Sequence, residues 1–541
     1  MVNRLRYRPN SVLLPLFIPN MAILGALLKN GVKLGKAIEQ ENKSPFKLQK
    51  KQLKKLLKMS MFTEIGKKYH FDRVLAPLSL LSLSNKREFY NRYKKNVPIY
   101  SYNRIYNEFW HKSLDGKADV TWPGKVKYFA LSSGTSEAAT KHIPVTKHMI
   151  KAIRKTSLRQ VLALHHYHLP SDIYTKGILM LGGSTHLHYN GTYFEGDLSG
   201  IGASNLPFWF QHFYKPGRRI SRYRDWNEKL EEIVKAAPNW DIGFIVGVPA
   251  WMQILLEMII ERYKLKNIHE IWPNLSVYTH GGVSFEPYKK GFEKLLGRPI
   301  KYIETYLASE GFIAFQDDPN SEGMKMILNN GIFYEFVPFN SDNFDADGEI
   351  KDKAQTLIID EVEEGKEYAL LLSSCAGAWR YLIGDVVRFL NKKKAEIVIT
   401  GRTKHYLSLC GEHLSVDNMN KAIEMVSNDL NIDIKEFAVA GIPHQTLFAH
   451  HWWIGCDSPV DQYLLKNKLD DYLKELNDDY KVERIAALKD VFLTVLPTEV
   501  FYAWMESKGK VGSQNKFPRV LKNGTLDSWV DFIREWKTDK V

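Results

Sequence analysis

Cysteine is scarce in this chain of 541 residues, which contains only Cys375, Cys410 and Cys456. Because the three lie far apart in the sequence, neither a disulfide framework nor a Cys-x-x-Cys metal site is indicated, and a reducing cytoplasm is the expected setting. The chain also lacks low-complexity tracts and fixed-period repeats, which excludes fibrous and solenoid folds. A chain of this length is expected to bury large cores and to divide into more than one domain.

Long apolar runs are absent too, and none reaches the roughly 20 residues that a membrane-spanning helix needs. Pro15 and Pro19 break the apolar stretch near the N-terminus, and no small-x-small cleavage site follows it. We therefore expect neither an integral membrane segment nor a signal peptide. Residues 45–58, PFKLQKKQLKKLLK, predict a basic amphipathic helix. We interpret it as a solvated helix that packs its leucines on the large domain; peripheral contact with a membrane is the alternative.

Acidic residues are fewer than basic ones, since 61 Asp and Glu stand against 75 Lys and Arg and give a formal net charge of +14. This excess favours anionic ligands, and it suits ATP and carboxylate substrates as readily as nucleic acid. No nucleic-acid motif with interleaved aromatic residues accompanies it, so we expect no nucleic-acid partner. The Walker pattern is missing as well, which disfavours an ordinary phosphate-loop NTPase.

A different phosphate-binding loop is predicted in residues 130–146, ALSSGTSEAATKHIPVT. Residues 128–131 predict a buried strand, and small residues follow it, so that backbone amides and hydroxyls can converge on an anion. These small residues are Ser132, Ser133, Gly134, Thr135 and Ser136. Lys141 then supplies a positive charge. Taken alone, the cluster is equally compatible with a plain turn.

Two later segments would complete a nucleotide site. In residues 302–315, YIETYLASEGFIAF, a ring suited to stacking on a purine, Tyr306, lies four residues from Glu310. A carboxylate near phosphates implies a divalent cation between them, so Glu310 is a candidate magnesium ligand. In residues 379–389, WRYLIGDVVRF, Gly384-Asp385 interrupts an apolar strand pair, and Asp385 is placed to accept both ribose hydroxyls. The plainer alternatives are a half-buried strand aromatic for Tyr306, a surface turn for Glu310 and a hairpin turn for Gly384-Asp385.

Together the three segments resemble the auxin-responsive acyl-acid amido synthetase family, a branch of the luciferase-like adenylate-forming superfamily. That family carries, in this order, a Ser-Ser-Gly-Thr-Ser loop followed by Lys, a Tyr-Ala-Ser-Ser-Glu segment and a Tyr-Arg-x-Gly-Asp-like segment. The chain departs from the pattern at Trp379, where tyrosine is usual, and at Ala138 and Thr140, where glycine and proline are frequent. The resemblance implies a phosphate loop at residues 132–136 with Lys141, an adenine contact at Tyr306, a cofactor contact at Ser309, a magnesium carboxylate at Glu310 and a ribose ligand at Asp385.

The resemblance continues toward the C-terminus. Residues 397–414, IVITGRTKHYLSLCGEHL, are similar to the superfamily hinge. On that basis Arg402 contacts the ribose or phosphate end of the nucleotide, and Thr403-Lys404 is the pivot; the alternative is a strand-turn-strand with exposed Arg402 and Lys404. Residues 508–522, KGKVGSQNKFPRVLK, resemble the terminal loop whose lysine enters the active site, and we assign that role to Lys516.

The fold implied is α/β with two domains. We expect a large N-terminal adenylation domain over residues 1–400, with a β-rich subdomain after residue 325, and a small mobile α+β domain over residues 401–541, joined at a hinge near 401–404. Short apolar runs at residues 178–181, 242–248 and 275–278, alternating with helical patterns, agree with such a fold.

The function implied is that of a cytoplasmic ligase. With ATP and Mg²⁺ it would activate a carboxylic acid as an acyl-AMP, with Lys516 and Lys141 as catalytic residues, and then transfer the acyl group to the amine of an amino acid. An acyl-CoA ligase of the same fold is one alternative. A non-catalytic protein that binds nucleotide or a surface through its basic residues is another.

Overall fold

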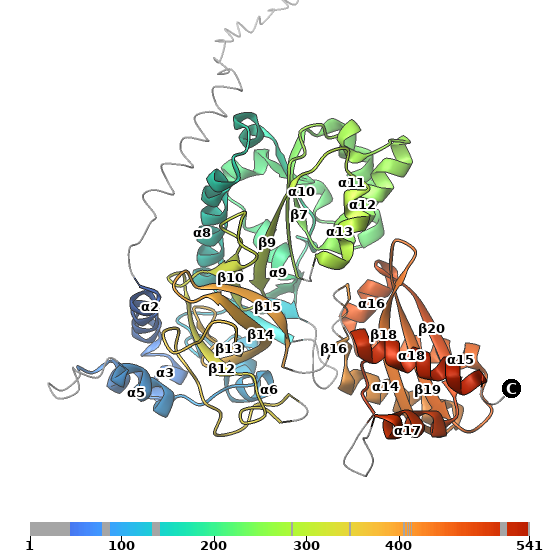
Figure 1. Ribbon diagram of the computed structural model, residues 1–541. Helices are drawn as coiled ribbons and strands as arrows, with labels where there is room; N and C mark the ends of the chain where they lie inside the picture. Colours follow the sequence, from blue (N-terminus) through green and yellow to red (C-terminus); the bar gives the residue numbers. More distant parts are fainter. Residues whose placement is uncertain are drawn as a thin grey trace, which may run out of the picture.

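The structure is a computed structural model that describes residues 44–77, 87–132, 141–282, 285–345, 348–403, 406–407, 409–410, 412, 414–508 and 517–538. Figure 1 shows a larger N-terminal body and a smaller C-terminal body, drawn in orange and red. No helix in these ranges is long and apolar enough to cross a membrane.

Helices form the N-terminal edge of the larger body. They are α2 (Pro45–Ser60), α3 (Glu64–Lys68), α4 (Phe71–Leu75), α5 (Glu88–Asn96), α6 (Tyr102–Ile105), the π-helix η2 (Tyr106–Trp110) and α7 (His111–Leu114). The predicted packing of α2 is confirmed, because Leu53, Leu56 and Leu57 are each at most 1% exposed. Gln49 fixes the helix to the body: its amide nitrogen donates to the carbonyl of Leu328 at 2.7 Å.

A small sheet of order β2-β1-β5-β4 carries the predicted phosphate-loop segment. Its strands are β1 (Tyr128–Ser132), β2 (Lys141–Val145), β4 (His188–Tyr189) and β5 (Phe194–Gly196). The strand predicted at residues 128–131 is thus confirmed. The antiparallel pairing of β1 with β2 places Ser132 opposite Lys141. Helix α8 (Lys147–Ala163) begins at once after β2, where the side chain of Thr146 caps it.

The core of the larger body is an eleven-stranded sheet of order β12-β13-β14-β15-β11-β10-β9-β8-β7-β3-β6. The strands are β3 (Gly177–Met180), β6 (Tyr214–Lys215), β7 (Ile242–Gly247), β8 (Val277–Gly281), β9 (Lys301–Ala308), β10 (Gly311–Phe315), β11 (Met324–Met326), β12 (Ile332–Pro338), β13 (Glu367–Ser374), β14 (Tyr381–Asn391) and β15 (Glu396–Arg402). Strands β6, β3, β7, β8 and β9 pair in parallel, and the others are antiparallel. The β-rich region expected after residue 325 therefore extends this sheet.

Helices cover both faces of the parallel strands, as Figure 1 shows. The connecting elements are α9 (Leu198–Ser204), α10 (Gly217–Ile220), α11 (Trp226–Ala236), α12 (Pro249–Tyr263), α13 (Glu286–Glu293), η3 (Leu164–Tyr167), η4 (Ser171–Thr175), η5 (Phe208–His212), η6 (Ala237–Asn239) and η7 (Ile268–Glu270). Ile245 and Tyr278 share a core with α11 to α13. Phe244 and Val277, one residue earlier on the same strands, pack under η3 and η4. This alternation explains why the strands read as continuous apolar runs.

The antiparallel half of the sheet is strongly curled. Strands β14 and β9 are separated by β15, β11 and β10, which corresponds to about 19 Å across a flat sheet. Yet the hydroxyl of Tyr306 on β9 lies 2.5 Å from Oδ2 of Asp385 on β14. Only a sheet that bends back on itself can bring these two side chains together, so its curvature creates the place where they meet.

The smaller body is built on the sheet β18-β19-β20, with the two-stranded β16-β17 beside it. Its elements are β16 (Tyr406–Leu407), β17 (Leu414–Ser415), α14 (Val416–Leu430), β18 (Ile434–His444), β19 (Leu447–Cys456), α15 (Gln462–Leu476), α16 (Asp478–Ile485), β20 (Leu488–Leu496), α17 (Thr498–Ser507) and α18 (Asn523–Thr538). Trp452 packs in the core with α14 to α16, and its neighbour Trp453 packs with α17 and α18 on the other face.

Hydrogen bonds between described residues join the two bodies. The indole of Trp251 on α12 donates to Glu483 on α16 at 3.2 Å. The amide of Gln253 donates to the carbonyl of Thr446 at 3.1 Å, and Tyr288 on α13 donates to the carbonyl of Leu409 at 2.7 Å. The C-terminal body is therefore held against the helices that cover the parallel strands.

Candidate active site

Residues from the second and third predicted segments meet in one cluster. Tyr306 donates a hydrogen bond of 2.5 Å to Oδ2 of Asp385, and Nε of Arg402 lies 3.1 Å from Oδ1 of the same carboxylate. Asp385 therefore has both oxygens engaged from opposite sides. Burial raises the pKa of Tyr306 well above its ordinary value, and the negative charge of Asp385 raises it further, so the hydroxyl stays protonated and donates.

Glu310 lies beside this cluster in the turn between β9 and β10. It is 8% exposed. Burial raises the pKa of its carboxyl to about 7, the charge of Asp385 adds to the rise, and the charges of Lys141 and Arg402 oppose it. The surface turn that was the plainer alternative for Glu310 is thus wrong, because the carboxyl is buried among charged groups from three segments of the chain.

The position of Asp385 corrects one expectation. The Gly384-Asp385 pair does not separate two strands; it lies inside the continuous strand β14, so the hairpin turn is wrong as well. Where β14 pairs with β13, Val386 lies opposite Ala369 and Leu382 lies opposite Leu371. The residues of β14 between Leu382 and Val386 therefore form a bulge. Gly384 has a φ of 91° in this bulge, a conformation that favours glycine. The bulge turns the Asp385 side chain toward Tyr306.

The predicted phosphate loop is described only at its two ends. Ser132 ends β1 and Lys141 begins β2; Ser133, Gly134, Thr135 and Ser136 lie outside the described residues. The ammonium of Lys141 lies 5.4 Å from the ring centre of Tyr102, and its charge reaches Glu310. The first segment thus opens onto the cluster formed by the other two, in agreement with a single site.

The hinge segment contributes Arg402, at the end of β15 and paired in register with Asp385. Its side chain is 29% exposed, so it is partly buried and the alternative of a fully solvated arginine is wrong. Ser309 lies in the turn beside Glu310. Lys404 and Lys516 lie outside the described residues, and their roles remain predictions. The stacking of Tyr306 on adenine also remains one, since Tyr306 is only 5% exposed here.

The sequence interpretation missed Tyr381. Its side chain is 2% exposed, and its hydroxyl is hydrogen-bonded to Glu310; burial first, and then the charge of Glu310, raise its pKa well above the ordinary value. Tyr381 stands in the quoted segment WRYLIGDVVRF, three residues before Gly384. Nothing in that segment showed that its side chain faces a carboxylate on another strand.

The cluster fits a bound cation. Glu310 and Asp385 are close enough for one carboxylate to raise the pKa of the other, and a divalent ion would relieve that repulsion. Within the described ranges no group of three or more His, Cys, Asp or Glu side chains forms a metal site. Oxygen atoms from a second ligand, such as phosphates, would therefore have to complete the coordination of an ion at Glu310.

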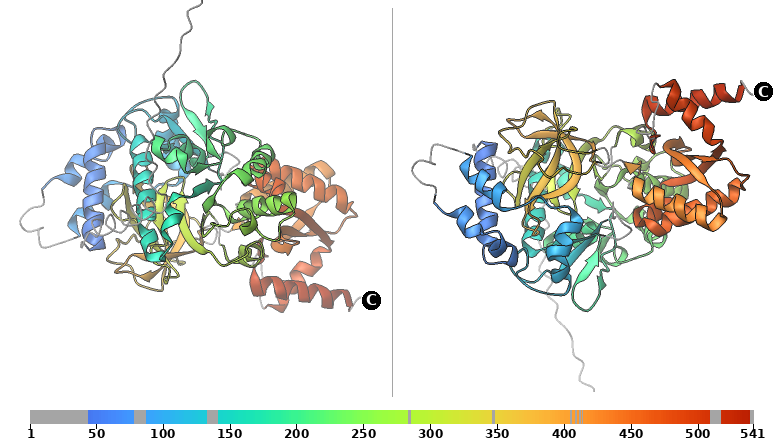
Figure 2. Two further views of the ribbon diagram at one scale, coloured as in Figure 1. Left: turned by 90° about the horizontal axis from the view of Figure 1, so that it is seen from above. Right: turned by 90° about the horizontal axis from the view of Figure 1, so that it is seen from below.

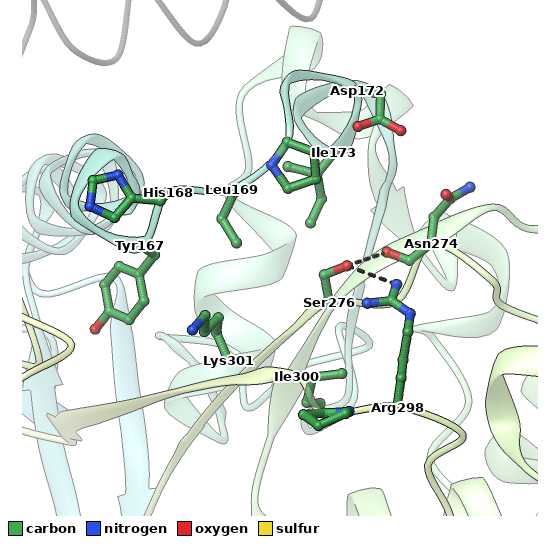
Figure 3. A pocket seen from close by; sticks show the side chains of 12 residues that line it. Tyr167, His168, Leu169, Asp172, Ile173, Asn274, Ser276, Arg298, Ile300 and Lys301 are labelled. Carbon is green, nitrogen blue, oxygen red and sulfur yellow. Dashed lines mark hydrogen bonds between the residues drawn. The ribbon is translucent and has the colours of Figure 1, made fainter.

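A pocket of about 270 Å³ lies elsewhere, at the amino ends of β8 and β9 (Figure 3). Tyr167, His168, Ser276, Arg298 and Lys301 are among its lining residues. Arg298 donates to the hydroxyl of Ser276 at 3.2 Å. The site cluster lies at the opposite, carboxyl end of the parallel strands, where α/β sheets bind their ligands, so we do not assign this pocket to the same site.

Similarity to known sequences covers most of the chain. The GH3 family N-terminal domain matches residues 34–188 and 160–300, the central domain matches 325–402, and the C-terminal domain matches 417–525. The indole-3-acetic acid-amido synthetase GH3.2 of Arabidopsis thaliana is 28% identical over 168 residues, and the chain covers 30% of its length. The jasmonoyl-L-amino acid synthetase JAR6 of Nicotiana attenuata is 22% identical over 460 residues, which span 74% of this chain and 76% of that protein.

Solved structures agree in fold. The acyl acid amido synthetase AtGH3.15, in complex with 2,4-DB, superposes with a TM-score of 0.55 at 15% identity over 96% of this chain and 97% of that one. A 2-hydroxyisobutyryl-CoA ligase in its thioesterification state superposes with a TM-score of 0.54 at 10% identity over 90% and 91%. The chain therefore belongs to the GH3 family and has the two-part α/β fold of the adenylate-forming enzymes.

Proposed function

We propose that this protein is an acyl-acid amido synthetase, which uses ATP to activate a carboxylic acid and then transfers the acyl group to the amine of an amino acid. The observation that carries the proposal is the cluster of Lys141, Tyr306, Glu310, Asp385 and Arg402, drawn from three segments in the chain order of the GH3 family. The names of the relatives, which include amido synthetases for two plant acids, support it.

Activation changes the leaving group on the acid. An oxygen of the substrate carboxylate attacks the α-phosphorus of ATP, the bond to the β-phosphate oxygen breaks, and pyrophosphate leaves with the electron pair. The amine nitrogen then attacks the acyl carbon, the bond to the AMP oxygen breaks, and the nitrogen loses a proton. Because the carboxylate is itself the first nucleophile, positioning and charge stabilisation carry most of the first step.

Each residue of the cluster has a role in this scheme. Asp385 accepts the ribose hydroxyls, Lys141 and residues 132–136 hold the phosphates, Ser309 lines the nucleotide site, and Arg402 binds the ribose or phosphate end. Glu310 is the residue that would hold Mg²⁺, and the ion, when bound, neutralises phosphate charge. With a pKa of about 7, Glu310 of the free site holds a proton below pH 7, and a bound cation would displace that proton.

The domain assignment belongs to the same proposal. We place the boundary at residues 400 and 401, with the pivot at Thr403-Lys404 and Lys516 entering the site for adenylation only. Thr403 is 5% exposed and its amide donates to the carbonyl of Gly384 at 2.8 Å, so the proposed pivot begins directly beside the bulge that holds Asp385. We place the enzyme in the cytoplasm, since its three cysteines are free and buried.

Coenzyme A is the acceptor to distinguish from an amino acid, because a CoA ligase superposes almost as well as an amido synthetase. The test is pyrophosphate release from ATP and Mg²⁺ over a panel of carboxylic acids, with pooled amino acids, with coenzyme A, or with neither. Mass spectrometry of the product then identifies the bond formed.

We expect acid-dependent pyrophosphate release that amino acids accelerate, with an N-acyl amino acid as product. A thioester instead would identify an acyl-CoA ligase. A protein that binds ATP but releases no pyrophosphate with any acid or acceptor would contradict the enzymatic proposal, and a protein that binds no ATP would also contradict the assignment of the cluster. Asp385→Asn serves as the matched inactive control.

A further inference from the structure

One side of the larger body carries a strongly basic surface on α2 and α8. Helix α2 contains six lysines and α8 contains five lysines and arginines, and neither helix contains an acidic residue. In α2 the residues Lys47, Lys51 and Lys55, which follow one another at intervals of four, are all exposed and form one stripe along the helix. The leucines of α2 face the core instead, so its outer face is almost purely cationic.

Seen from above, the two helices run next to each other (Figure 2, left), and α8 lies above α2 in the view of Figure 1. Their buried residues share one core cluster. Lys55 of α2 is close enough to His148 of α8 to lower the pKa of that imidazole, after the larger effect of burial, and Lys151 acts in the same sense. The charges of α2 and α8 therefore form a single surface, which we call the α2–α8 face.

Carboxylates do not neutralise α2. Among the described residues, none of its six lysines makes an ion pair with an Asp or Glu side chain; Lys50 and Lys54 instead lie over the rings of Phe46 and Phe89. Such a surface repels itself unless an external anion covers it. On α8, Lys151, Lys155 and Leu158 share a stripe, and Leu158 is 53% exposed, so the surface also offers an apolar contact.

We propose that the α2–α8 face docks on an anionic lipid bilayer. A bilayer surface matches the arrangement because it presents a broad sheet of negative charge, and each Lys or Arg held near it adds to the attraction. The preceding residues 1–43 contain Arg4, Arg6 and Arg8 and the apolar stretch SVLLPLFIPNMAILGALL, and the chain enters α2 directly after them. In the sequence, an apolar segment thus precedes a polybasic helix, and apolar insertion together with a polybasic patch supplies the two signals that stable membrane association needs.

Nucleic acid is the less suitable partner. Recognition of single strands uses exposed aromatic side chains on which bases stack. Helix α8 contains no Phe, Trp or Tyr, and the single aromatic residue of α2, Phe46, packs on Tyr90 with 5.6 Å between ring centres. The face offers charge without a stacking platform.

The test is co-sedimentation of the full chain with vesicles of four parts phosphatidylcholine to one part phosphatidylserine, compared with pure phosphatidylcholine. The variant K47E/K51E/K55E reverses the α2 stripe. Its matched control, K421E/K481E/K489E, reverses three exposed lysines of the C-terminal body and changes the net charge equally. A second variant, K147E/K151E, reverses the α8 side of the face. Thermal melting verifies that each variant is folded.

We expect binding that requires phosphatidylserine and weakens steeply as salt rises to about 0.5 M. Each basic residue near the surface contributes roughly a fivefold increase in partitioning, so the α2 triple variant should lose about 100-fold or more. The α8 variant should lose less, and the control should stay within a few fold of the wild type.

Three results would overturn the proposal. The first is a wild type that does not sediment with anionic vesicles. The second is an equal loss of binding by the α2 variant and its control, which would mean that net charge alone is responsible. The third is a short RNA duplex that binds the protein more tightly than the vesicles do and displaces them. None of these readings depends on catalysis, so failure of the proposed enzymatic function leaves the test intact.

Discussion

Replacing Glu310 by glutamine should stabilise the free protein at neutral pH while it impairs adenylation. The carboxyl is 8% exposed, and its pKa is raised from the ordinary value of 4.5 to about 7 by burial and by the charge of Asp385. A rise of that size corresponds to about 3 kcal/mol as an upper bound. The folded protein carries this cost above pH 7, where the carboxylate is forced into its ionised form, and a neutral amide removes it.

The sign follows from proton binding. Between pH 4.5 and about 7 the folded state holds a proton on Glu310 that the unfolded state has released. Unfolding therefore releases this proton, and the free energy of unfolding falls as pH rises through this window. It is unaffected by this group below pH 4.5 and constant above about 7. The advantage of the glutamine variant should therefore grow across the same window.

Thermal melting at a series of pH values measures this difference. For a domain of about 400 residues, 3 kcal/mol corresponds to a rise in melting temperature of roughly 3–4 °C. Glu424→Gln removes one negative charge from an exposed position on α14 and is the matched control, with no change expected. Two results would refute the electrostatic account of this site. One is a Glu310→Gln variant that is less stable than the wild type at pH 8, and the other is a melting temperature that differs from that of the wild type by the same amount at pH 4 and pH 8.

Three further changes test other contacts. Asp385→Ala should weaken ATP binding at least tenfold in calorimetry, since charge-assisted hydrogen bonds are lost; unchanged affinity would contradict the ribose assignment. Lys516→Ala should leave ATP affinity unchanged and slow pyrophosphate release by about 100-fold, and normal kinetics would move that role to another lysine. Glu412→Gln should destabilise the C-terminal body by about 3 kcal/mol at pH 7, because Glu412 and His450 form a fully buried pair at 3.0 Å. That loss should disappear as pH falls toward 2, the pKa to which hydrogen bonds and the charge of His450 lower this carboxyl despite its burial.

Local patterns predicted the elements well. The apolar runs at residues 178–181 and 242–248 correspond to β3 (Gly177–Met180) and β7 (Ile242–Gly247). Among the helices that alternate with these runs, α11 (Trp226–Ala236) has Asp225 as its cap, which accepts from the amide of Glu228 at 2.8 Å. Periodicity and capping act over a few residues, so a single sequence contains the information that fixes them.

Pairings between distant strands could not be predicted in the same way. The Gly384-Asp385 pair has the composition of a turn, and only its partner strand β13 makes it a bulge. Arg380 is similar: its guanidinium lies 2.9 Å from Glu335, and the two side chains are 6% and 1% exposed. The family resemblance predicted Asp385 and Glu310 as site residues. Neither it nor the local sequence indicated that the hydroxyl of Tyr306 bonds to Asp385 or that the hydroxyl of Tyr381 bonds to Glu310.

The curled sheet brings Tyr306 into hydrogen-bonding contact with Asp385, the proposed ribose ligand. In the free protein both carboxylate oxygens of Asp385 already have partners, Tyr306 and Arg402. If Asp385 binds the ribose as proposed, the ribose hydroxyls must share these oxygens with the tyrosine and the arginine or displace them, and displacing the tyrosine would use part of the binding free energy. A Tyr306→Phe substitution would remove the occupant in advance. On that assignment the curvature of the sheet at β10 and β11 influences nucleotide binding, because it brings Tyr306 to the carboxylate of Asp385.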